Sequence, residues 1–374
     1  MKRLAYIDWL RGMACFGMFI THSYDAWLRP AFHDTRFYRA TQLIGTLPAP
    51  IFLLLAGASI ALSTEKLREK GIHRHTIARQ TVLRGAEIFG LGLLFRIQEY
   101  ALGYRWVPWT DLLRVDILNA IGIAMVLAGV LVWLASAPDI EVARRRGIRA
   151  GLIGATLFAL LTPPLWTTLR PRFLPWPLES YLNGVHVYQQ PQHWLFPIFP
   201  WCGFTFAGVA LGFALFTGFA RLREAMFFVY LGIGGALAFI ASIIFDAVPF
   251  QLYSDYDYWH SSPEFFLARC GVIAMLLSVS YAWCRWGFAL QGFSPALQLG
   301  ATTLLVYWVH IEFVYGRLSF LPKHGCNIPL ATLGLAIITA AMLGLSIART
   351  RWIKSHRAKK DASISSERPV LANP

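Results

Sequence analysis

The chain has 374 residues, of which 56% are hydrophobic and only 14% are charged, and its mean hydropathy is +0.49. This composition excludes an ordinary soluble domain and is typical of proteins that cross a membrane several times. The formal net charge is +14, but Lys and Arg lie mostly in short stretches between apolar runs. We therefore interpret them as determinants of membrane orientation and as contacts to anionic membrane lipid, and we expect no nucleic-acid partner.

Apolar windows of about 20 residues, the length needed to cross a bilayer, recur along the chain and predict an all-α polytopic transmembrane bundle of about ten spans. We place these spans near residues 5–22, 41–63, 80–97, 112–134, 149–168, 194–220, 225–246, 264–284, 296–316 and 328–348. Lys and Arg are concentrated in alternate connections, which predicts that both termini are cytoplasmic. We expect residues 1–350 to form one transmembrane domain and residues 351–374 to be a disordered basic tail in the cytoplasm.

The first predicted span carries three polar residues in otherwise apolar sequence: Asp8, Arg11 and His22. Arg11 and His22 are eleven positions apart, close to three helical turns, so they share a face and lie ~16 Å apart along the axis. Placing Arg and Asp at membrane depth costs at least ~2.5–3.5 kcal/mol each on insertion scales. This cost predicts that the face lines a polar cavity and has a function.

Ionisable residues also fall inside later spans, where buried charges commonly mark a substrate route. Arg84 lies toward the predicted cytoplasmic side, and four others lie toward the outer ends of spans: Arg114, Asp116, Arg269 and His310. Each has a simpler alternative explanation. Arg84 can pair with Glu87 three positions on, and Arg114 can extend to the membrane interface. Asp116 can bond between helices, and His310 can be a structural residue.

The residue types at these positions suit acyl transfer. A histidine can take a proton from a hydroxyl or amine nucleophile, or can itself be acylated. An arginine stays protonated, and its forked donors match phosphate or pyrophosphate. A donor that reaches from Arg11 to His22 would carry phosphates at one end and a reactive carbonyl at the other, which is the form of acyl-coenzyme A. The sequence contains no GxGxxG, Walker A or GxSxG motif that would indicate another chemistry, and we predict no metal site.

Several stretches resemble known membrane acyltransferases. The first span resembles the first-helix motif of the integral-membrane acyltransferase-3 proteins in its IDWLRG sequence, with ten residues between Arg11 and His22. Five other stretches are more similar to the related heparan-alpha-glucosaminide N-acetyltransferase-like group: PAPIFLLLAGASIAL (48–62), LLRVDILNAIGIA (112–124), FPIFPWCGFTFAGVALG (196–212), SPEFFLARCG (262–271) and LGATTLLVYWVH (299–310). The resemblance covers about residues 4–320.

The resemblance implies transfer of an acyl group, usually acetyl, from cytoplasmic acyl-CoA to a small-molecule or glycan acceptor at the outer face. By this likeness Arg11 holds the donor, and His22 is the catalytic base or acyl carrier. The lysosomal members use a histidine in the loop after the first helix, where this chain has His33, so the choice between His22 and His33 stays open. The basic third-helix motif of acyltransferase-3 proteins is reduced here to Arg84 and a distant Arg96.

The predicted site therefore has three parts. Asp8 orients Arg11 and assists His22 in catalysis, and Arg84 joins Arg11 in binding acyl-CoA. The acceptor pocket is predicted from His33, Arg114, Asp116, Arg269 and His310. A secondary transporter or exporter of a polar solute is the alternative function, because transporters also bury charges along a path, although they commonly show internal repeats that are absent here. We expect an integral protein of a bacterial inner membrane.

Overall fold

The computed structural model describes residues 4–184, 196–248, 252–253, 257–287 and 292–366, with side chains described as far as His356. These residues form α-helices, short 3-10 helices and a single isolated bridge between Leu28 and Cys326, and the predicted all-α class is confirmed. The helices divide into two compact units. Unit 1 comprises Met1–Leu10 and Thr46–Phe288, and unit 2 comprises Arg11–Gly45 and Ala289–Pro374, so the boundary falls within the first helix, α1 (Ala5–Trp27).

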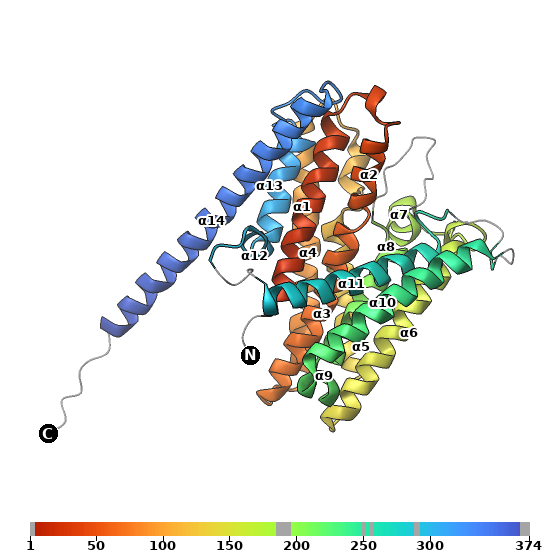
Figure 1. Cartoon of the computed structure of the whole chain (residues 1–374), viewed down its shortest axis with the longest axis vertical. Helices are drawn as coiled ribbons and strands as arrows, with labels where there is room; N and C mark the ends of the chain where they lie inside the picture. Colours follow the sequence, from red (N-terminus) through yellow and green to blue (C-terminus); the bar gives the residue numbers. More distant parts are fainter. Residues whose placement is uncertain (1–3, 185–195, 249–251, 254–256, 288–291, 367–374) are drawn as a thin grey trace. The chain divides into compact units, whose positions relative to one another are not determined.

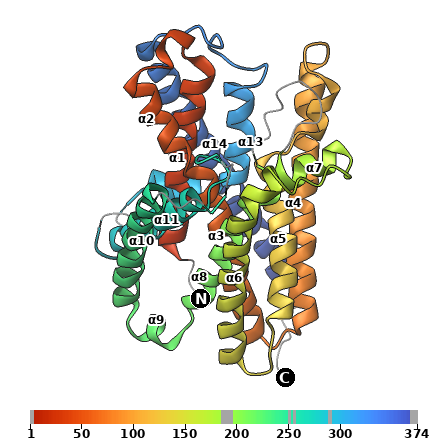
Figure 2. The same cartoon turned by 90° about the vertical axis from the view of Figure 1, so that its right-hand side faces the viewer.

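Unit 1 contains the longer series of helices (Figures 1 and 2). They are α3 (Pro48–Glu69), α4 (Arg74–Gly103), α5 (Ile117–Leu134), α6 (Ile140–Trp166), α7 (Trp176–Asn183), α8 (Ile198–Ala214), α9 (Gly218–Leu222), α10 (Glu224–Ala247) and α11 (Pro263–Trp286), with the 3-10 helix η2 (Trp109–Leu113) before α5. The main packed pairs are α4 with α5, α3 with α8, α6 with α8, and α10 with α11. Helices α10 and α11 run side by side in both views.

Glycines allow α3 and α8 to approach closely. A Cβ added at Gly57 of α3 would overlap the carbonyl oxygen of Thr205, and one added at Gly208 of α8 would overlap that of Leu54. The hydroxyl of Thr205 donates to the carbonyl of Leu53 at 3.1 Å across the same crossing. Small residues at such positions let membrane helices gain van der Waals contact and bond to each other's backbone. This crossing forms part of the core of unit 1.

Unit 2 is built from the two ends of the chain. It contains the greater part of α1, the 3-10 helix η1 (Pro30–Phe32), α2 (Arg36–Gly45), α12 (Pro295–Gly300), α13 (Thr303–Val314) and α14 (Ile328–Ser366). Helix α13 packs beside α14 (Figure 1). The predicted span 296–316 is thus two helices, since the chain leaves the helical path after Gly300 and resumes at Thr303.

Six segments of the described residues are long and apolar enough to cross a membrane: Arg36–Glu69, Trp109–Leu134, Ile140–Trp166, Glu224–Ala247, Pro263–Trp286 and Ile328–His356. Helices α8 and α13 are apolar but shorter. Helices α1 and α4 contain the predicted spans 5–22 and 80–97 but are not among these six segments. The chain is an integral membrane protein, while ten spans and cytoplasmic termini stay predictions.

Helix α14 has 39 residues and continues to Ser366, beyond the point at which we expected the transmembrane domain to end. Residues 367–374 of the predicted tail lie outside the described residues. The division into a domain of residues 1–350 and a disordered tail stays a prediction.

Candidate functional site

Helix α1 carries the three polar residues of the first predicted span on one continuous helix. Asp8 is buried, with 7% of its surface exposed, and Arg11 and His22 are half-buried. The helix continues to Trp27 without a break, so the separation of ~16 Å between Arg11 and His22 follows from the helical rise. The geometry that the donor hypothesis requires is therefore present in α1.

His22 forms a hydrogen bond to a second histidine. Its Nδ1 lies 2.9 Å from Nε2 of His310 on α13, and the two rings are stacked, with centroids 5.1 Å apart and planes 5° from parallel. His310 is fully buried. The structure thus brings together two histidines that the sequence places in different predicted roles.

The partners of His310 decide where the protons lie. Nδ1 of His310 lies 2.8 Å from the carbonyl oxygen of Tyr307 and 3.2 Å from that of Val306. A carbonyl oxygen can only accept, so Nδ1 of His310 carries the proton, and Nε2 of neutral His310 is an acceptor. His22 must then donate from its Nδ1. The remaining nitrogen of His22, Nε2, is left with a lone pair that can take a proton or attack a carbonyl.

A carboxylate and two phenols lie beside this histidine pair. The hydroxyl of Tyr315 donates to Oδ2 of Asp25 at 2.6 Å, and the hydroxyl of Tyr38 donates to Oδ1 at 2.9 Å. The ring of Tyr315 meets His22 edge-on with centroids 5.3 Å apart, and the ring of Tyr38 stacks on His33 at 4.2 Å. The two candidate catalytic histidines therefore belong to one network, which also contains Asp25 and the two tyrosines, none of which was among the predicted site residues.

His33 ends the 3-10 helix η1, and its backbone N–H donates to the carbonyl of Pro30 at 2.9 Å. Its Nε2 is buried, and no described residue forms a hydrogen bond to it. His324 lies edge-on to it, with ring centroids 6.0 Å apart. An unpaired buried nitrogen is unusual in a folded protein, so the Nε2 of His33 is an exception among the buried polar atoms of the described residues.

The predicted acceptor residues Arg114 and Asp116 lie together in unit 1. Asp116 caps α5 by accepting from the N–H of Leu118 at 3.2 Å, and it forms a buried ion pair with Arg96 of α4. Tyr181 of α7 is near this pair: burial and the Asp116 carboxylate raise the pKa of its phenol to about 12, against the lowering effect of Arg96. Arg114 follows η2 directly and is half-buried. This cluster is largely neutralised by its own charges.

Two other predicted residues of unit 1 have different surroundings. Arg84 is 58% exposed and pairs with Glu87 at 2.8 Å, the alternative that its spacing suggested. Arg269 is buried over the ring of Phe265, 3.9 Å from the centroid, and donates from Nη2 to the carbonyl of Trp259 at 3.1 Å. Its Nε has no hydrogen-bond partner within the part of the chain that the structure describes. The rings and the carbonyl partly replace the water that this guanidinium has lost.

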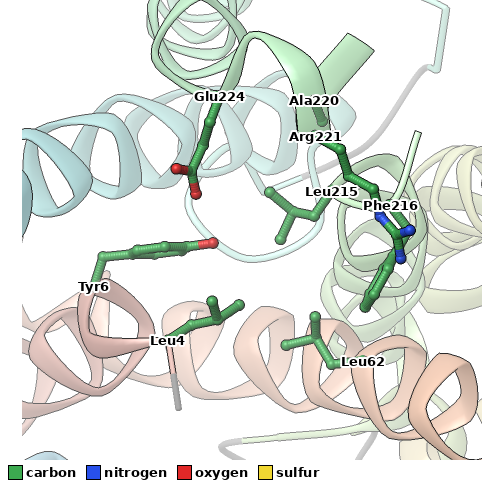
Figure 3. Close-up of a pocket in the computed structure, with 8 residues that line it drawn as sticks. All are labelled: Leu4, Tyr6, Leu62, Leu215, Phe216, Ala220, Arg221 and Glu224. Carbon is green, nitrogen blue, oxygen red and sulfur yellow. The ribbon is translucent and has the colours of Figure 1, made fainter. Parts of the chain in front are cut away.

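Unit 1 also contains a cavity of about 240 Å³ (Figure 3). It is lined by Leu4, Tyr6, Leu62, Leu215, Phe216, Ala220, Arg221 and Glu224. Tyr6 and Glu224 face each other at one end, and Arg221 lies over Phe216 at the other. Ligand sites commonly have 300–1,000 Å³, so this cavity is too small for a whole acyl-CoA molecule, and it includes no predicted site residue.

Among the described residues, no group of three or more His, Cys, Asp or Glu side chains is placed to hold a metal ion. The residues that complete the network in unit 2 are only weakly indicated by the sequence. Asp25 follows His22 by three positions on α1. This spacing could have predicted Asp25 as a site residue, because residues three apart share a helical face. Tyr38 and Tyr315 had no such signal, since they reach Asp25 from distant segments.

Comparison with protein families gives a match over more than half of the chain. The family model described as heparan-alpha-glucosaminide N-acetyltransferase, catalytic, matches residues 3–228. This range includes Asp8, Arg11, His22 and His33, but ends before His310. No curated protein matches the chain. The family predicted from the sequence motifs is confirmed.

Proposed function

Because the chain belongs to the heparan-alpha-glucosaminide N-acetyltransferase family, we propose that it transfers an acyl group, most simply acetyl, from acyl-CoA to a hydroxyl or amine of a small polar or glycan acceptor. The observation that carries this proposal is the hydrogen-bonded pair of His22 and His310. It leaves one basic nitrogen on His22, as a general base requires. In this proposal the chain is a membrane transferase with acyl-CoA as its donor and a small polar or glycan molecule as its acceptor.

In the proposed reaction, Nε2 of His22 takes the proton from the acceptor's hydroxyl or amine. At the same time the acceptor's oxygen or nitrogen attacks the thioester carbonyl. The tetrahedral intermediate collapses, the carbon–sulfur bond breaks, and coenzyme A leaves as the thiolate, which recovers the proton. His310 holds the donating tautomer of His22, much as a third group orients the base of other acyl-transfer sites. His310 thereby becomes a positioning residue in place of the acceptor-pocket role predicted for it.

Arg11 is the proposed ligand of the donor's phosphates. A guanidinium binds phosphate oxygens with two parallel hydrogen bonds, and its distance of ~16 Å from His22 along α1 is comparable to the length of the pantetheine arm. Asp8, buried one turn before Arg11, is proposed to orient it. With the predicted topology, the donor enters from the cytoplasm and the acceptor lies at the outer face.

The remaining predicted residues stay part of the proposal. Arg114, Asp116 and Arg269 contribute to acceptor binding, and Arg84 is a further donor ligand. His33 is the alternative base, supported by its unpaired Nε2. Both histidines lie in the same network in unit 2, so either assignment places the chemistry there.

The test is acetyl transfer from radiolabelled acetyl-CoA to glucosamine by the purified protein in lipid nanodiscs. His22→Ala should lower kcat by about 10²–10⁴-fold, the usual contribution of a general base. His310→Ala should lower kcat by about 10–100-fold, and His310→Gln, which keeps an acceptor near the position of Nε2, should recover part of it. His356→Ala, at an exposed histidine of α14, is the matched control.

A His22→Ala protein that works at the wild-type rate would overturn the assignment of His22, and loss of activity in His33→Ala alone would transfer the role to His33.

A further inference from the structure

Asp25 is bonded to two tyrosines, each of which packs against one of the two candidate catalytic histidines. Its two carboxylate oxygens each accept one phenol hydroxyl, Oδ1 from Tyr38 and Oδ2 from Tyr315. The phenols come from opposite ends of the chain, since Tyr38 lies on α2 and Tyr315 directly follows α13. A carboxylate shared in this way is occupied on both oxygens and is poorly placed to act as the base itself.

Each phenol in turn limits the movement of one histidine. The Tyr315 ring meets His22 at 65° to its plane, on a ring whose Nδ1 is already bonded to His310. The Tyr38 ring lies 4° from parallel with His33. Aromatic rings prefer such stacked or edge-on contacts. A tyrosine fixed at its hydroxyl therefore fixes the plane of the imidazole that packs against it.

The backbone around Tyr38 is also tied to α1, so its position is not set by Asp25 alone. The N–H of Tyr38 donates to the hydroxyl of Thr35, and the hydroxyl of Thr21 on α1 donates to the carbonyl of Thr41 at 2.8 Å. With the start and the middle of α2 held, the remaining freedom of Tyr38 is rotation of its side chain. The hydrogen bond to Asp25 restricts that rotation.

We propose that Asp25 is a positioning residue that holds His22 and His33 in fixed orientation within one acyl-transfer site, acting on His22 through Tyr315 and on His33 through Tyr38. The transfer step itself rests on the proposed function. The positioning role of Asp25 rests on the geometry alone. We call Asp25 with Tyr38 and Tyr315 the clamp, and the connection through either tyrosine can be removed without the other.

Two measurements test the clamp. The first is the rate at which diethyl pyrocarbonate modifies His22 and His33, read residue by residue with mass spectrometry of the full-length protein in nanodiscs. Tyr315→Phe should raise the modification rate of His22 several-fold and leave that of His33 unchanged, and Tyr38→Phe should do the reverse. Asp25→Asn should raise both rates. Tyr24→Phe is the matched control, because the Tyr24 hydroxyl is bonded to Thr332 at 2.8 Å, whereas the Asp25 carboxylate accepts from Tyr38 and Tyr315.

The second measurement is acetyl transfer from acetyl-CoA to glucosamine. Asp25→Asn should lower kcat by about 10–100-fold, the range that follows from small misplacements of a reacting group. The KM for acetyl-CoA should stay within about twofold, because Asp25 follows Arg11 by fourteen positions on α1, which is ~21 Å along the helix axis. Equal modification rates in wild type, Tyr38→Phe and Tyr315→Phe would overturn the clamp, as would changes of the same size in Tyr24→Phe. If the wild-type protein transfers no acetyl group, the proposed function fails, and the modification rates still decide the clamp.

Discussion

The two units differ in how the polar side chains discussed above are paired: by ion pairs in unit 1 and by a hydrogen bond between two histidines in unit 2. In unit 1, fully buried Glu65 on α3 forms ion pairs with Arg144 of α6 at 2.8 Å and with Arg68 at 3.4 Å. Asp116 forms an ion pair with Arg96. In unit 2, His22 and His310 share one hydrogen bond between rings that can stay uncharged. In an ion pair the charge of each partner is compensated by the other. In the histidine pair, Nε2 of His22 keeps a lone pair and stays available as a base. Two of these ion pairs of unit 1, those of Arg144 and Arg96, join helices, and we propose that the proton transfer takes place in unit 2.

The largest effect on the unit 1 side should come from Glu65→Leu. Removing this carboxylate leaves Arg144 and Arg68 without their shared partner, and breaking a buried pair costs about 3–5 kcal/mol of the free energy of unfolding. Chemical unfolding in detergent micelles measures the change. Glu141→Gln is the control, because Glu141 also pairs with Arg144 but its side chain is 50% exposed, and its loss should cost at most about 1 kcal/mol. Equal destabilisation by both substitutions would contradict the structural role given to Glu65.

A smaller loss is expected at Asp116, where two contributions can be separated. Asp116→Ala removes the cap of α5 and the partner of Arg96, and it should cost about 2–3 kcal/mol, because Arg96 keeps Glu99 at 3.9 Å. Asp116→Asn keeps a good capping residue and should recover about 1 kcal/mol of that loss. The measurement is again chemical unfolding. If Asp116→Asn raises the KM for glucosamine while stability is unchanged, Asp116 serves the proposed acceptor binding more than helix packing, and the contrast between the units weakens.

The smallest effect should come from the exposed pair of Arg84 and Glu87. Exposed ion pairs contribute about 0–1 kcal/mol, so Arg84→Gln and Glu87→Gln should each leave the free energy of unfolding within about 0.5 kcal/mol of wild type. Their kinetics sharpen the comparison. If Arg84 binds the donor's phosphates, Arg84→Gln should raise the KM for acetyl-CoA and Glu87→Gln should not. An unchanged KM in both variants removes Arg84 from the donor site.

The family and the helical class could be predicted from the sequence because both depend on local features, namely motif order and apolar length. The pairing of His22 with His310 could not, since it joins positions 288 residues apart and nothing in either span marks the other as its neighbour. Glu65 was missed for a different reason. The apolar window ends near residue 63, which places Glu65 in a predicted loop, whereas α3 continues to Glu69 and buries it.

The broken span at 296–316 shows a further limit. Hydropathy integrates over a window and reports one apolar segment, but the chain forms α12 and α13 with a short interruption at residues 301–302. The interruption shortens the helix that carries His310 to 12 residues. Apolar content cannot reveal this, because Ala301 and Thr302 do not lower the window average enough to divide it.

Assembly of unit 2 from both ends of the chain has a consequence for biosynthesis. Proteins are made from the N-terminus at about 5–20 residues per second, so roughly 15–60 s separate the synthesis of His22 from that of His310. During that interval Asp25 lacks Tyr315 and His22 lacks its ring partner. The proposed catalytic network can therefore be completed only after the chain has been made as far as Tyr315. A chain that stops early, even one that contains all of residues 3–228 matched by the family, carries the candidate base without the residue that orients it.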